Sequence, residues 1–131
     1  MSTNADALKK GYDAFRQGDM DSVRSIWTDD TEWQGPDLDS LPDAGRFTGP
    51  DAIIEMFGRL PEYWDGLKVT PDEFLEDGDT VVVLGHNEGR GKSTGDEWKV
   101  PFVHAWRIRD GKAERVELLY DTGVTARALG V

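Results

Sequence analysis

Residues 98–108 alternate strictly between two kinds of side chain, and this pattern constrains the fold more than any other feature of the chain. Trp98, Val100, Phe102, His104, Trp106 and Ile108 share one parity. Lys99, Pro101, Val103, Ala105, Arg107 and Arg109 share the other. Side chains in a strand point to opposite faces in turn, so this segment predicts a strand with one aromatic face that carries a single imidazole. Such a face is typical of a pocket wall.

The chain before this strand predicts three helices. Residues 5–17 place Leu8, Tyr12 and Phe15 at helical spacing, and Gly18 stands where such a helix would end. Asp19 is a good N-cap for a second helix that runs to about Trp27. A third helix is expected from Pro50, a favoured first-turn residue, to the break at Pro61.

The remaining pattern predicts strands joined by short turns. The expected strands are residues 31–34, 67–75, 80–87, 98–108 and 113–120, with turns at 77–79 and 110–111 and flexible connections at 35–46 and 89–95. A short helix is expected at 122–129. Pro101 inside a long strand indicates an edge or a bulge, and bulges bend sheets.

Helices followed by hairpin-linked strands are typical of the α+β class. At 131 residues the chain is expected to form one domain, residues 1–131. We expect a cone in which three N-terminal helices cover one side of a curved, mostly antiparallel sheet, leaving a hollow inside. The 37% of hydrophobic residues suffices for a core.

Charge and composition exclude several classes of function. The formal net charge of −11 repels phosphate backbones and anionic lipids, so neither nucleic-acid nor membrane binding is expected. The absence of cysteine excludes disulfides and thiolate chemistry. Residues 1–7 are polar and lack the apolar core of a signal peptide, which favours a cytoplasmic location.

The order of motifs resembles the nuclear-transport-factor-2-like superfamily, in its SnoaL-like and steroid-isomerase-like branch. The similarity rests on Tyr12-Asp13-Ala14-Phe15 with Gly18-Asp19, on Gly35-Pro36, on Ala44-Gly45-Arg46-Phe47-Thr48-Gly49, and on the run from His104 to Lys112 before Tyr120-Asp121. It implies the cone fold, a homodimer formed through the outer sheet face, and functions from isomerase, cyclase, dehydratase and hydrolase to simple binding. Arg107, Arg115 and Glu117 would lie on that outer face.

The steroid isomerases among these relatives use a general-base Asp with a Tyr and a protonated Asp as donors. Counted without gaps from Gly18-Asp19, these positions fall on Gly35, Gly11 and His104. The resemblance therefore does not carry the isomerase machinery over, although a slip of one residue would bring Gln34 or Tyr12 into play. The epoxide-hydrolase network is not supported either, because no Asp shares the His104 face.

His104 is the candidate catalytic residue, because an imidazole titrates near neutral pH. The alternative is a neutral core histidine with a hydrogen-bonded partner. The candidate ligand-binding residues are Tyr12, Trp27, Trp33, Gln34, Phe57, Phe102, Trp106, Leu118 and Tyr120. We expect Trp27, Phe57 and Trp64 to lie on helices at the mouth. Asp37, Asp39 and Asp43 are placed in a loop from which a base would reach the pocket, or they form a solvated turn.

Two functions remain open. One is cofactor-free acid–base catalysis of the isomerase, cyclase, dehydratase or hydrolase type on a small hydrophobic substrate. The other is non-catalytic binding of an apolar molecule or a protein-interaction module of the same fold. No metal site is expected, because the two histidines stand on different strands without zinc-ligand spacing. Binding of a small molecule in the cavity is common to both enzyme and binder.

Overall fold

The computed structural model describes residues 3–131, so the first two residues of the polar N-terminal segment lie outside it. In chain order the elements are α1 (Asn4–Gln17), α2 (Met20–Arg24), β1 (Trp27–Gln34), β2 (Arg46–Thr48), α3 (Pro50–Arg59), η1 (Leu60–Glu62), β3 (Trp64–Asp77), β4 (Thr80–Gly91), β5 (Glu97–Arg109), β6 (Lys112–Tyr120) and α4 (Thr122–Leu129). No helix in this part of the chain is long and apolar enough to cross a membrane.

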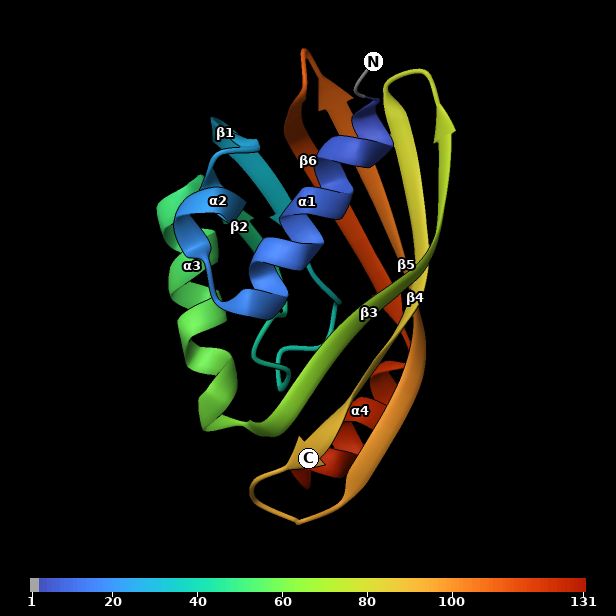
Figure 1. Cartoon of the computed structure of the whole chain (residues 1–131). Helices are drawn as coiled ribbons and strands as arrows, with labels where there is room; N and C mark the ends of the chain where they lie inside the picture. Colours follow the sequence, from blue (N-terminus) through green and yellow to red (C-terminus); the bar gives the residue numbers. More distant parts are fainter. Residues whose placement is uncertain (1–2) are drawn as a thin grey trace.

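The strands form one curved sheet in the order β2-β1-β6-β5-β4-β3 (Figure 1). All neighbours are antiparallel except β1 and β6, which run parallel. The register shifts twice within β3 and once between Arg107 and Ile108 of β5. Such irregularities increase the local twist and bend, which allows the long strands to curl around an interior. The expected α+β cone is therefore confirmed.

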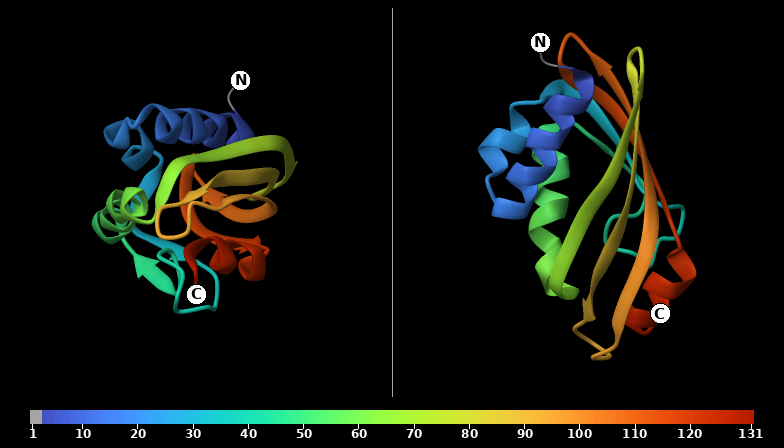
Figure 2. Two further views of the ribbon diagram at one scale, coloured as in Figure 1. Left: turned by 90° about the horizontal axis from the view of Figure 1, so that it is seen from below. Right: turned by 45° about the vertical axis from the view of Figure 1, so that its right-hand side comes forward.

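Helices cover the concave side of the sheet at two places. Figure 2 shows α1, α2 and α3 on one side of the interior and α4 near the opposite end of the long strands. The buried side chains accordingly form two clusters. Leu8, Ile53, Trp106 and Val116 belong to the larger one, and α4 packs on Trp98 in the smaller one. The inner face of β5 is buried at every second residue, as its alternation predicts.

Local signals explain most of the element ends. Gly18 ends α1 in the left-handed conformation with φ +73°, and Asp19 caps α2 by accepting from the backbone N–H of Ser22. Asp110 and Gly111 both have positive φ, as a tight hairpin turn between right-twisted strands requires. The helix expected at residues 122–129 is present and begins at the N-cap Asp121.

The second helix is shorter than predicted, and Trp27 belongs to a strand. The hydroxyl of Ser25 donates to the carbonyl of Ser22, and the backbone N–H of Ala113 donates to the carbonyl of Ile26 at 2.6 Å. The chain therefore leaves α2 at Arg24 and joins the sheet beside β6. Trp64, expected on a helix, is likewise the first residue of β3 and pairs with Gly91.

The connection predicted at residues 35–46 is followed by one element that was not predicted, β2, which begins at Arg46. The short strand β2 pairs with β1 through Trp33 and Phe47. Pro101 was expected at an edge or a bulge, but β5 is an interior strand and its pairing with β4 continues without a shift. Pro101 lies outside the paired stretch of β5 and β6, so its missing N–H removes no ladder bond on that side.

Candidate functional site

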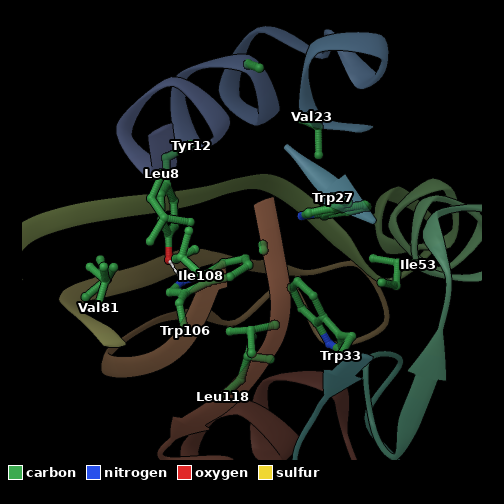
Figure 3. Close-up of a cluster of buried hydrophobic side chains, with 14 of the residues drawn as sticks. Leu8, Tyr12, Val23, Trp27, Trp33, Ile53, Val81, Trp106, Ile108 and Leu118 are labelled. Carbon is green, nitrogen blue, oxygen red and sulfur yellow. Dashed lines mark hydrogen bonds between the residues drawn. The ribbon is translucent and has the colours of Figure 1, made fainter. Parts of the chain in front are cut away.

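An apolar cavity lies between the sheet and the helices, where the two buried clusters meet. Its volume is about 110 Å³, and all five tryptophans of the chain line it. The predicted site residues that line it are Tyr12, Trp27, Trp33, Phe57, His104, Trp106, Leu118 and Tyr120. Figure 3 shows Tyr12 pointing from α1 toward Trp106, with Leu118 nearby and with Trp27 and Trp33 across from them.

Two of the predicted residues lie outside this lining. The side chain of Gln34 is turned toward β2, where it donates to the carbonyl of Gly35 and accepts from the guanidinium of Arg46 at 3.3 Å. The ring of Phe102 lies against His104, with ring centroids 3.8 Å apart and an interplanar angle of 11°. Phe102 therefore packs behind the lining of the cavity, and Gln34 points away from the cavity toward β2.

A buried hydrogen-bonded chain runs from β5 to α1 and back. The indole N–H of Trp106 donates to the hydroxyl oxygen of Tyr12 at 3.0 Å. The same hydroxyl lies 2.6 Å from Nδ1 of His104. His104 is 4% exposed and Tyr12 is 8% exposed, so all three polar groups meet away from bulk water.

Burial fixes the charge of this group of side chains. Desolvation lowers the pKa of His104 to about 3 and raises the pKa of Tyr12 above its usual value. Both rings are therefore neutral at physiological pH. Nε2 of His104 has no hydrogen-bond partner among residues 3–131, so it is the ring atom available to an occupant of the cavity.

Asp43 brings a carboxyl group to the cavity wall. It comes from the loop between β1 and β2, and its oxygens accept from the hydroxyl of Tyr120 at 2.8 and 3.1 Å. Burial raises the pKa of Asp43, and the Tyr120 hydrogen bond offsets part of that rise. Burial and the neighbouring carboxylate raise the pKa of Tyr120. This pair gives the cavity a group that can exchange a proton.

Sequence reasoning named Asp43 together with Asp37 and Asp39 and did not separate them. In the structure Asp37 and Asp39 are exposed, and Asp43 is turned inward. The signal that would have distinguished it is Leu41, two residues earlier, which is 3% exposed and packs in the smaller cluster. An apolar residue inside a polar loop indicates that the loop folds back onto the core.

Glycines shape both sides of the site. A Cβ at Gly35 would lie 1.8 Å from the carbonyl oxygen of Asp43, so the loop closes only over a residue without a side chain. A Cβ at Gly11 would lie 2.6 Å from the side chain of Ile26. The backbone approach at Gly35 therefore requires glycine, whereas the contact at Gly11 is with the flexible end of the Ile26 side chain.

The cavity wall also contains polar atoms that the protein leaves without a partner. Among the described residues these are Nε1 of Trp27, Trp33 and Trp98 and Oδ1 of Asn87, and all four side chains line the cavity. The sequence placed Trp98 on the predicted pocket wall with His104 without making it a candidate residue, and it gave no signal for Asn87. His86 lies elsewhere and pairs with Asp72 at 2.9 Å. No group of three potential metal ligands occurs within residues 3–131.

Known proteins share this architecture over the whole chain. A crystal structure of an NTF2-like protein from Burkholderia pseudomallei is 30% identical, with a TM-score of 0.92 and full coverage of both chains. The structure of TerC co-crystallised with polyporic acid is 33% identical, with a TM-score of 0.90, and covers 99% of this chain and 100% of that one.

A curated relative and a family model complete the comparison. Patulin synthesis protein F from Aspergillus clavatus is 30% identical over an alignment of 102 residues that covers 75% of this chain. The match covers 52% of that protein, so the chain spans about half the length of this relative. The model of the SnoaL-like domain matches residues 8–116. The chain therefore belongs to the SnoaL-like domain family, with the NTF2-like fold.

Proposed function

We propose that the cavity binds a small, largely apolar molecule that carries a carbonyl group, and that Asp43 moves a proton on it without a cofactor. The observation that carries this proposal is the inward carboxyl group of Asp43 on an otherwise largely apolar wall. Burial raises the pKa of Asp43, and carboxyl groups with raised pKa in clefts are typical of general acids and bases.

The reaction class is proton abstraction from a carbon next to the carbonyl. The carboxylate of Asp43 takes the proton, the C–H bond breaks, and the electron pair moves onto the carbonyl oxygen. Return of the proton to another carbon completes an isomerisation. Departure of a hydroxyl group with that proton releases water and completes a dehydration. The Tyr120 hydroxyl orients the carboxylate throughout.

The unpartnered polar atoms of the wall support an oxygenated ligand. A buried N–H without an acceptor is destabilising by roughly 1–3 kcal/mol, and three indoles are in this condition. A ligand that carries several oxygen atoms would supply acceptors once the rings adjust to it. The co-crystallisation of the similar TerC with polyporic acid agrees with this class of ligand.

The second candidate is a non-catalytic binder of the same kind of molecule. It is favoured by Gly11 and Gly35, on which the tyrosine and the base of the steroid isomerases fall in the count without gaps. In this case the raised pKa of Asp43 is a consequence of loop packing alone.

Binding and proton transfer are measured separately in the first experiment. Quenching of tryptophan fluorescence by polyporic acid and by 2-tetralone reports binding, because all five tryptophans line the cavity. Exchange of the α-protons of 2-tetralone in D2O, followed by NMR, reports proton transfer. We expect Asp43→Asn to slow the exchange by roughly 100-fold or more and to preserve binding.

The matched control is Asp39→Asn, an exposed residue of the same loop, which should exchange at the wild-type rate. The rate should also fall at low pH as Asp43 is protonated, at a pH above the ordinary titration of aspartate because its pKa is raised. Binding without exchange above the buffer rate would establish the binder instead. Absence of quenching by both compounds would contradict the binding proposal.

A further inference from the structure

We propose that His104 serves the cavity as a neutral hydrogen-bond donor through Nε2–H, in a tautomer fixed by Trp106 and Tyr12. The tautomer is a property of the free protein. Its use toward a ligand oxygen rests on the proposed function. The sequence favoured His104 as the group that moves the proton, whereas the proposed function gives that role to Asp43, and the hydrogen-bonded chain makes the imidazole a partner for the developing negative charge.

The direction of the chain follows from its first member. The indole of Trp106 can only donate, so the hydroxyl oxygen of Tyr12 accepts at 3.0 Å. The Tyr12 hydrogen is then free to point at Nδ1 of His104, 2.6 Å away. Nδ1 must accept this hydrogen bond and therefore carries no proton. A neutral imidazole has one N–H, which places it on Nε2.

The opposite tautomer satisfies fewer groups. If Nδ1–H donated to Tyr12, the oxygen of Tyr12 would accept twice, and its own hydrogen would need a third partner. No other hydrogen bond to this hydroxyl exists within residues 3–131. Tyr12 is 8% exposed, so the unpaired hydrogen would be buried. The charged imidazolium is also disfavoured, because burial lowers the pKa of His104 to about 3.

Packing holds the ring in place. Phe102 stacks on His104 with centroids 3.8 Å apart, and the ring of Tyr12 is tilted only 9° from that of His104. Because the Tyr12 hydroxyl occupies the Nδ1 side, Nε2 lies on the opposite side of the ring. A fixed donor in a site that excludes water stabilises a developing oxyanion far better than one in water. The electron pair released when Asp43 takes the proton would end on the oxygen held by Nε2–H.

The tautomer is measured by two-bond ¹H–¹⁵N NMR on the protein labelled at histidine. The chain has two histidines, so His86→Gln assigns the remaining ring to His104. We expect a neutral Nε2–H ring at pH 6–8, with the Nδ1 resonance displaced by its hydrogen bond. Tyr12→Phe should move that resonance to the position of a free lone pair. A protonated Nδ1 or a charged ring in the wild type would overturn the proposal, as would an Nδ1 resonance that Tyr12→Phe leaves unchanged.

The role toward a ligand is tested with 2-tetralone. Binding should move the Hε2 resonance downfield. His104→Gln keeps a side-chain N–H and should retain the α-proton exchange within about tenfold, while His104→Met should lose about 100-fold. Equal losses in both variants would overturn the donor role. If the wild type shows no exchange, the proposed function fails, and the tautomer measured in the free protein still decides the first part.

Discussion

A buried neutral histidine makes the stability of this protein depend on pH. Burial lowers the pKa of His104 in the folded protein to about 3, whereas an unfolded chain has the ordinary value near 6.5. Below pH 6.5 the unfolded chain binds a proton that the folded protein does not, so acid favours unfolding. We therefore predict that the free energy of unfolding falls by about 1.2 kcal/mol between pH 6 and pH 5.

Denaturant unfolding at pH 7, 6, 5.5 and 5 measures this slope above the main titration of the carboxylates. His104→Gln should remove it, because the amide does not titrate. His86→Gln is the matched control and should keep it, since His86 is partly exposed and lies outside the core. A slope that persists in His104→Gln would show that another group is responsible.

At the scale of elements, the loop between β1 and β2 determines whether the cavity has a carboxyl group. The backbone N–H of Gly35 donates to the carbonyl of Gly45 at 2.8 Å, and that of Gly45 donates to the carbonyl of Pro36 at 3.1 Å. Leu41 anchors the loop in the smaller cluster, and the Asp43–Tyr120 hydrogen bonds connect it to β6. The loop is therefore built as a closed unit over the cavity.

We predict that Gly35→Ala opens this loop. The added Cβ would lie 1.8 Å from the carbonyl oxygen of Asp43, a distance at which the backbone must move. The expected loss is about 1–3 kcal/mol of stability, as for other overpacked sites, together with most of the α-proton exchange. Thermal unfolding and the 2-tetralone assay measure the two effects.

Gly58→Ala in α3 is the control substitution of the same chemistry. Its Cβ meets open space, and alanine is the better helix former, so stability should rise by about 0.5–1 kcal/mol. A Gly35→Ala variant that retains both stability and exchange would show that the loop does not need this close approach.

Elements with strong local signals were predictable, and those that depend on distant contacts were not. The alternation around His104, the stop at Gly18 and the cap at Asp121 each determine their element from nearby residues. The end of α2 depends on pairing with β6, which lies far away in the sequence. The strand β2 depends on pairing with β1 and carries no local pattern of its own. The inward turn of Asp43 likewise depends on Leu41 and Tyr120, so the sequence alone could not distinguish Asp43 from Asp37 and Asp39.

At the scale of the molecule, the helices cover the concave face of the curved sheet, and the opposite face is exposed. The concave face carries the cavity between the two buried clusters. The opposite face of β6 carries Leu119, which is 63% exposed, beside an ion pair of Arg115 and Glu117 at 2.7 Å. The family resemblance implies pairing of two copies through this outer face, and an exposed leucine beside charged residues is compatible with such an interface.

We predict a homodimer whose stability increases with salt. Each chain carries a formal charge of −11, so two copies repel each other at low ionic strength. Raising the salt concentration from about 0.01 M to about 0.15 M shortens the screening length from about 30 Å to about 8 Å, which weakens this repulsion. Sedimentation velocity at both salt concentrations should show that the dimer fraction rises with salt.

The variant Leu119→Glu should shift the protein to monomer and leave quenching by polyporic acid unchanged, because Leu119 lies outside the cavity lining. A monomer at both salt concentrations, or a dimer that tolerates Leu119→Glu, would place the interface elsewhere or remove it.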